Sequence, residues 1–276
     1  RHTTQYFEIA GNRAIYHDGW FARTIHRAPW EAKPRRTLED NSAWELYDTR
    51  ADFSLANDLA ARNPQKLAEL QALYLQQAEK YHVLPMDDRV FERLDAVAVG
   101  RPDLMGGRTS MTLADGMSGM MESVFINVKN RSKTITAEVD VPQGGGNGTV
   151  LAQGGRFGGW SLYVKDGVPG YHYNFLGLQQ TSIVASKPLV PGKTTLKFDF
   201  AYDGGGPGKG GLGTLYVNGG KVAEGRIEHT QGGLFSADET ADVGIDLGTP
   251  VVESIGAEHA SKFSGHIPKV TVEVRK

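Results

Sequence analysis

Aromatic side chains gather in residues 160–175, where they could bind a sugar. A Trp or Tyr ring offers a large rigid apolar surface with a polar edge, which suits stacking against the apolar face of a pyranose. We therefore expect Trp160, Tyr171 and Tyr173 to be the carbohydrate-binding residues. The alternative is that Trp160 belongs to the core and the tyrosines lie half-buried on a sheet. The same strand pattern places His172 opposite the two tyrosines, as a packed or surface side chain.

Acidic side chains raise two further possibilities. Glu138 and Asp140 share one face of a strand, as the two carboxylates of a glycosidase would, although outward acids on a sheet more often serve solubility. Asp203, Asp242 and Asp246 lie near turns and could supply oxygen ligands to calcium, but aspartate is common in turns for conformational reasons. No catalytic residue and no metal site is assigned from these patterns.

Several chemistries are excluded. The chain has no cysteine, which excludes disulfides, thiolate zinc sites and a cysteine nucleophile. The glycine-rich segment 204–210 contains a Gly-Lys pair, but no Ser or Thr follows the lysine and no helix pattern comes next, so it predicts a loop. The net charge of −2 excludes a broad electrostatic mode of nucleic-acid binding. No run of about 18 apolar residues predicts a membrane span.

Glycine divides the 276-residue chain into two regions. Of 35 glycines, 33 lie from Gly100 onward. Before that point, residues 6–9 and 13–16 predict a hairpin and residues 44–48 a third short strand. Asn63 and Pro64 are good residues for a helix start, and the helix is expected to stop at Pro85. The predicted fold of residues 1–85 is therefore α+β, a small antiparallel sheet plus a helix.

The second region predicts an all-β jelly-roll sandwich over residues 107–276. Apolar and polar residues alternate over 132–141, 160–165, 195–202 and 269–274, and Gly-rich turns separate the alternating runs. Many short strands without a convincing helix are typical of a sandwich or barrel. Residues 86–106 are charged and irregular, which predicts a linker or a strap over the surface.

The first region resembles the carboxy-terminal subdomain of type I sulfatases. The resemblance rests on five segments in the family's order, which are residues 5–8, 11–20, 44–48, 52–53 and 57–60. The helix expected over Asn63–His82 resembles the family's closing helix. The form of the second segment that ends in His17-Asp18-Gly19-Trp20, together with the long Gly-rich tail, resembles bacterial arylsulfatases.

The resemblance implies a sulfuric ester hydrolase that uses formylglycine, made from Cys or Ser in a Cys/Ser-x-Pro-x-Arg motif, together with calcium. This chain holds neither Cys nor a Ser-x-Pro-x-Arg motif, so it is predicted to be inactive alone and to carry no cofactor. Its partner would be an upstream sulfatase catalytic domain, whose fold it would complete. It would also shape substrate access or oligomer contacts, and a homo-oligomer is one expected assembly. Tyr6, Ile15, Trp44 and Leu46 would pack on that domain.

The second region resembles, more loosely, laminin-G and concanavalin-A-like jelly rolls. The similar segments are residues 157–164, 198–204, 213–219 and 263–267. They indicate a fold and imply no particular ligand. The alternative function is therefore a carbohydrate-binding or protein-interaction module, with a glycan as the partner. The location stays open between bacterial cytoplasm and periplasm.

Overall fold

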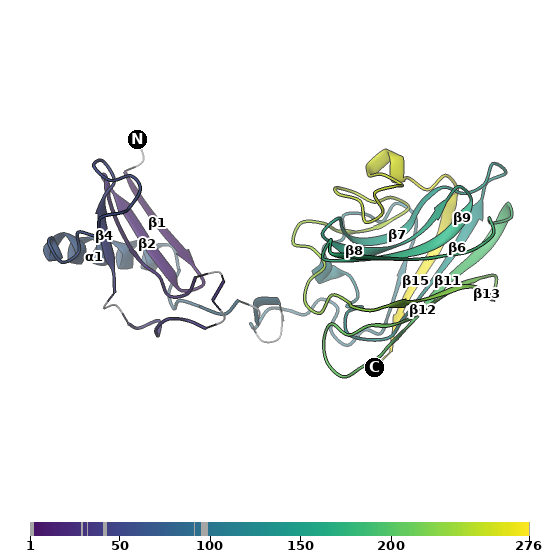
Figure 1. Cartoon of the computed structure of the whole chain (residues 1–276), viewed down its shortest axis with the longest axis horizontal. Coiled ribbons are helices and arrows are strands. Elements are labelled where there is room, and N and C mark those ends of the chain that lie inside the picture. The colour runs from purple at the N-terminus through teal and green to yellow at the C-terminus, as the bar shows by residue number, and fades with distance from the viewer. Residues whose placement is uncertain are drawn as a thin grey trace. The chain divides into compact units, whose positions relative to one another are not determined.

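The computed structural model divides the chain into two compact units, unit 1 (residues 1–99) and unit 2 (residues 100–276) (Figure 1). The predicted strap at residues 86–106 is thus divided between them. The structure describes residues 3–28, 30–31, 33–40, 43–90, 92–94 and 99–275. Within these residues no helix has the length and apolar character needed to cross a membrane.

Unit 1 contains a four-stranded antiparallel sheet in the order β1-β2-β3-β4, and one α-helix. The predicted hairpin is confirmed, because Tyr6 pairs with Ile15 across the first two strands. The strand expected at residues 44–48 is confirmed as Glu45–Asp48, whereas Trp20–Thr24 forms a strand, β3, that was not predicted. It follows a two-residue turn, Asp18-Gly19, in which both residues have positive φ, as a type I′ hairpin turn requires. The elements are β1 (Thr4–Ile9), β2 (Asn12–His17), β3 (Trp20–Thr24), β4 (Glu45–Asp48), α1 (Pro64–Lys80) and the short 3-10 helix η1 (Glu92–Leu94).

The helix of unit 1 covers one face of this sheet. Leu70, Tyr74 and Ala78 recur at helical spacing and are buried against the strands. The helix begins at Pro64, as predicted, and ends at Lys80, two residues before the expected end at His82. Residues 81–84 leave the helix through a turn in which His82 has a positive φ.

This packing corrects the expectation that the apolar residues of unit 1 need a missing domain. Ile15 and Leu46 are fully buried and Trp44 is 6% exposed, all three within the cluster formed with α1. A 17-residue amphipathic helix supplies enough apolar surface to cover the central strands. Apolar residues of unit 1 that stay exposed lie outside this cluster, among them Phe7 and Ile9 of β1, which are 49% and 72% exposed, and Phe53, which is 90% exposed.

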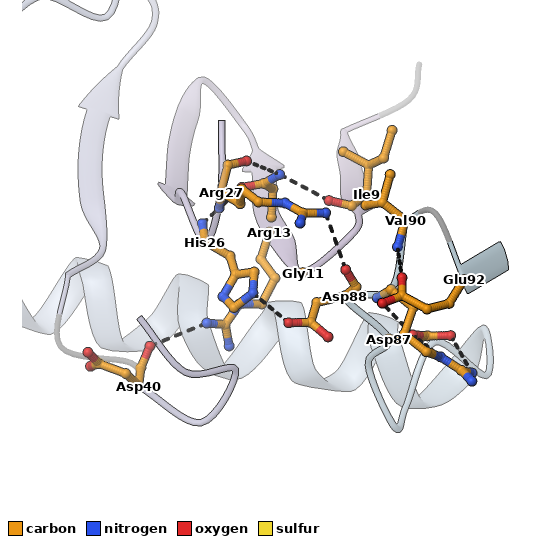
Figure 2. Close-up of polar contacts among 12 residues, drawn as sticks. Ile9, Gly11, Arg13, His26, Arg27, Asp40, Asp87, Asp88, Val90 and Glu92 are labelled. Carbon is orange, nitrogen blue, oxygen red and sulfur yellow. Dashed lines mark hydrogen bonds and ion pairs between the residues drawn. The ribbon is translucent and has the colours of Figure 1, made fainter. Parts of the chain in front are cut away.

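A buried histidine ties the segment after the helix to the sheet of unit 1. His26 is 2% exposed, and its Nε2 lies 2.9 Å from Oδ2 of Asp88 (Figure 2). The backbone N–H groups of His26 and Arg27 both donate to Oδ1 of Asn12, at 2.9 and 3.0 Å. Residues 86–88, expected to be a linker or strap, are thus held to the rest of unit 1 by a polar contact that is buried at His26 and partly exposed at Asp88.

Unit 2 is a two-sheet antiparallel β-sandwich, and the prediction of an all-β fold is confirmed. The six-stranded sheet has the order β13-β12-β11-β6-β15-β5. Its strands are β5 (Ser110–Leu113), β6 (Lys133–Val141), β11 (Gly192–Tyr202), β12 (Gly211–Val217), β13 (Gly220–Ile227) and β15 (His266–Val274).

The five-stranded sheet has the order β10-β9-β8-β7-β14 and lies in the other layer of the sandwich (Figure 1). Its strands are β7 (Gly148–Gly155), β8 (Gly158–Lys165), β9 (Val168–Phe175), β10 (Gln179–Val184) and β14 (Ala241–Val243). Two short 3-10 helices, η2 (Glu122–Val124) and η3 (Glu258–Ser261), lie in the connections.

Alternation along each strand builds the core of unit 2. In β6, for example, residues 135, 137, 139 and 141 are buried while the residues between them are half-buried or exposed. Glycine makes room where rings cross the core. A Cβ at Gly213 would lie 2.6 Å from Cδ1 of Ile183 and 2.7 Å from Cζ of Phe198, so β12 can lie against these side chains only with glycine there.

The outer faces of the two sheets differ. Val251 and Val252, from the connection between β14 and β15, pack on Ala152 and Tyr163 of the five-stranded sheet. Every residue of β7 is buried, so this sheet is covered on both sides at its centre. In the six-stranded sheet the outward residues of β6 and β15 are half-buried or exposed. We call the outward side of the six-stranded sheet the open face.

The contact between His26 and Asp88 predicts a measurable stabilisation of unit 1. Asp88→Ala should lower the free energy of unfolding of unit 1 by about 1–2 kcal/mol, because a buried imidazole loses its polar partner. Urea unfolding followed by tryptophan fluorescence measures this, since Trp20 and Trp44 lie in unit 1.

The neighbouring residue supplies the control. Asp87 forms an ion pair with Arg89, and both side chains are over one third exposed, so Asp87→Ala should change stability little. Equal urea midpoints for the two variants would contradict a structural role for Asp88.

Candidate functional site

The three aromatic residues expected to bind a sugar lie in the interior of unit 2. Trp160 and Tyr171 are fully buried and Tyr173 is 3% exposed. The rings of Trp160 and Tyr171 stack with centroids 6.1 Å apart, and Tyr171 stacks on Phe198 of the opposite sheet at 3.5 Å. These rings present no exposed face to a ligand, which corrects the expected surface platform.

The period of two explains this burial. Residues 160, 171 and 173 occupy inward positions of β8 and β9, where the sandwich needs large apolar groups. His172 lies on the opposite face, as predicted. Its Nδ1 is 2.8 Å from Oγ of Ser182 on the neighbouring strand, and its buried Nε2 has no hydrogen-bond partner. Burial lowers the pKa of this imidazole.

The structure nevertheless brings the predicted aromatic residues together, around a lysine. Lys133 is 3% exposed, and its Nζ lies 4.6 Å from the ring centroid of Trp160. The ring centroids of Phe200 and Tyr173 are 5.9 and 6.0 Å from the same atom. Among the described residues, no carboxylate lies within ion-pair distance of Lys133, so aromatic ring faces are its electrostatic neighbours.

A small cavity adjoins the amine. It leaves about 10 Å³ for the centre of a water-sized molecule, which is room for about one water. Tyr171 lines the cavity, and its buried hydroxyl has no hydrogen-bond partner. Tyr173 also lines it, and its Oη accepts a hydrogen bond of 2.7 Å from the backbone N–H of Gln231. A pyranose ring does not fit in this volume, which excludes the cavity as a sugar site.

Electrostatics set the state of the buried amine. Burial, with a smaller contribution from Lys129, lowers the pKa of Lys133 to about 7. Lys129 itself forms an ion pair with Glu122, whose second oxygen accepts the N–H of Phe235 at 2.9 Å. The carboxylate of Glu122 is thus engaged by Lys129 and Phe235. Near neutral pH, Lys133 is divided between its amine and ammonium forms.

Sequence reasoning missed Lys133, although a signal was present. The alternation used to predict the strand places residues 133, 135, 137 and 139 on the same face, and three of them are apolar. Lysine is almost never fully buried without a partner, so a lysine in phase with a buried face marks an unusual site. Its aromatic surroundings come from strands distant in sequence.

The acidic residues considered as calcium ligands do not assemble. Asp203 forms an exposed ion pair with Arg226, and the oxygens of Asp242 accept hydrogen bonds from Gly119 N–H and Thr240 Oγ1. Asp246 is buried, and desolvation raises its pKa to about 7. Within the described ranges there is no cluster of three or more His, Cys, Asp or Glu side chains able to hold a metal ion.

Glu138 and Asp140 lie on the open face, which carries an ordered arrangement of polar side chains. Strand register places five outward residues side by side across five strands, a set that we call the threonine row. The row consists of Tyr216, Lys197, Thr136, Thr271 and Thr112. With strands about 4.8 Å apart, it extends for about 19 Å. Glu138 belongs to a neighbouring row, between Thr195 and Lys269.

Comparisons with known proteins give remote structural matches. A SAP-like pentraxin from Limulus polyphemus is 17% identical, with 61% of this chain and 78% of that chain covered and a TM-score of 0.36. The Ruminococcus gnavus IT-sialidase CBM40 bound to α2,3-sialyllactose is 15% identical, with 61% and 92% covered and a TM-score of 0.40. Mouse laminin α1 domains LG4-5 are 13% identical, with 61% of this chain and 39% of that chain covered and a TM-score of 0.37.

No family model matches the chain, and no curated protein matches it. The resemblance of residues 1–85 to sulfatases therefore finds no support in these comparisons and stays a prediction. The same holds for the implied upstream catalytic domain, its calcium and its formylglycine.

The buried lysine predicts a distinctive pH dependence of stability. The pKa of Lys133 is about 7 in the folded state and its ordinary value is 10.5. Between these two pH values the unfolded chain therefore binds up to one more proton than the folded chain. The free energy of unfolding should rise from about pH 7 toward pH 10, by at most about 1.4 kcal/mol per pH unit. The gain is lost progressively as the pH falls from 10 to 7, and below pH 7 the slope vanishes because the amine is protonated in both states.

Lys133→Met should remove this rise and make unit 2 more stable than wild type at neutral pH, since methionine fills the site without a charge. Urea unfolding at several pH values measures the difference. Lys165→Met, at an exposed position, is the control and should keep the wild-type profile. A Lys133→Met profile that parallels wild type would show that this amine does not titrate near neutral pH in the folded state.

Proposed function

We propose that unit 2 is a carbohydrate-binding module and that its ligand lies on the open face. The observation that carries the proposal is the threonine row, in which hydroxyl, ammonium and aromatic groups lie side by side across five strands. A glycan is recognised through hydrogen bonds to its hydroxyl groups and through contact with its apolar ring faces. The row offers both along a length that suits an extended oligosaccharide.

Cross-strand contacts hold in place the polar groups of the row next to the threonine row, on the same open face. Thr134 Oγ1 donates to Oδ1 of Asp199 at 2.6 Å, and Nη2 of Arg275 donates to the same oxygen at 3.0 Å. Between β12 and β13, Thr214 Oγ1 donates to Oε2 of Glu224 at 3.1 Å. Side chains fixed in this way lose less conformational entropy when a ligand binds, which favours a binding role.

One end of the row combines an aromatic ring with a cation. The Nζ of Lys197 lies 5.2 Å from the ring centroid of Tyr216, and both side chains are half-buried. The ring is positioned to contact a sugar, and the ammonium to pair with a carboxylate or sulfate on it. Acidic glycans are therefore the preferred ligands in this proposal.

The other side of the sandwich is less suited to a ligand. Its central strands are covered by residues 251–252, and an ion pair of 2.9 Å between Arg156 and Glu253 joins the covering segment to the β7–β8 turn. The open face is the broad uncovered sheet surface of unit 2 within residues 100–275.

A glycan array tests the proposal directly. The full chain should bind one or more acidic oligosaccharides, and Tyr216→Ala and Lys197→Ala should each weaken binding by about tenfold, or about 1.4 kcal/mol, through loss of the ring or the cation. Isothermal titration with the best array ligand gives the affinities.

Two exposed residues away from the open face serve as matched controls. Phe157 is 72% exposed in the β7–β8 turn, and Lys187 is exposed between β10 and β11. Phe157→Ala and Lys187→Ala should leave affinity unchanged. No binding to neutral, carboxylated or sulfated glycans, or equal losses in the controls, would contradict the proposal.

A further inference from the structure

The cavity beside Lys133 has a polar lining that is unusual for a protein interior. Its amine has no hydrogen-bond acceptor and no carboxylate partner among the described residues. The hydroxyl of Tyr171 is buried without a partner. Tyr173 accepts a hydrogen bond from Gln231, and no acceptor for its own hydroxyl hydrogen is found in residues 99–275. The hydroxyl hydrogens of Tyr171 and Tyr173 thus have no acceptor in the described part of the chain.

Two of the polar side chains at the cavity edge, Asn130 and Thr230, are already engaged elsewhere. Oδ1 of Asn130 accepts the N–H of Gly208 at 2.8 Å, and its Nδ2 donates to the carbonyl of Gly232 at 2.8 Å. Thr230 Oγ1 donates to the carbonyl of Lys209 at 2.6 Å. Unpaired buried donors are costly, and native structures satisfy them with water or with ions.

We propose that the cavity lined by Lys133, Tyr171 and Tyr173 is a binding site for one monatomic anion of the chloride class. The ammonium form of Lys133 supplies the charge, and the two hydroxyl groups supply hydrogen-bond donors. The aromatic rings around the amine give a low-dielectric wall, which strengthens the attraction between ammonium and anion. Lys129, which lies in the turn before β6 and is paired with Glu122, adds positive potential near the amine.

The size of the cavity selects among anions. It holds about one water-sized molecule, which suits chloride or bromide and excludes gluconate or another polyatomic organic anion. The cavity is lined by residues 128–130 before β6 and by Thr230, Gln231 and Phe235 after β13. An anion there would join these two segments, so its binding should stabilise this end of the sandwich.

Thermal unfolding with chloride exchanged for gluconate at constant ionic strength tests the site. At about pH 6, where Lys133 is mostly protonated, chloride should raise the Tm of the full chain saturably by about 2–4 °C. Lys133→Met should abolish the rise and Tyr171→Phe should reduce it. Lys165→Met, which removes an exposed charge, should keep it.

A second measurement stands apart from the variants. Crystals of the wild-type chain grown in bromide should give an anomalous peak beside Nζ of Lys133. Equal Tm values in chloride and gluconate, a full chloride response in Lys133→Met, or a cavity that holds only water in the bromide crystals would each overturn the proposal. None of these results depends on whether the open face binds a glycan.

Discussion

The contact between stacked aromatic rings is the constraint on which unit 2 depends. Tyr171 lies between Trp160 of its own sheet and Phe198 of the opposite one, at 6.1 and 3.5 Å between centroids. Buried aromatic rings contribute large apolar areas, and their fit sets the distance and register of the two layers. Gly213 is glycine for this reason, since a Cβ there would collide with the ring of Phe198.

The same inward alternation that places these rings also places a lysine among them. Lys133 is in phase with the apolar residues of β6, so its side chain enters the edge of the aromatic cluster and is only 3% exposed. Burial shifts the amine toward its neutral form and leaves nearby hydroxyl hydrogens without acceptors. The alternation along β6 that makes Lys133 a core residue thus also creates the candidate anion site.

The two sheets of the sandwich differ because only one is covered. Val251 and Val252 bury the centre of the five-stranded sheet, whereas the six-stranded sheet keeps its polar rows in contact with solvent. In unit 1 the division is similar, with α1 over one face of the sheet and Phe7 and Ile9 left exposed at other positions. Apolar surface is buried where a covering segment exists.

Local pattern by itself determined the two regions, the hairpin and helix of unit 1, and the sandwich class of unit 2, because turn residues and periodicity act over a few neighbours. Tertiary structure alone decided which rings are inside. Trp160, Tyr171 and Tyr173 looked suited to a sugar, but pairing with the other sheet makes them core. The threonine row, too, depends on the register of five strands that are distant in sequence, which no local spacing encodes.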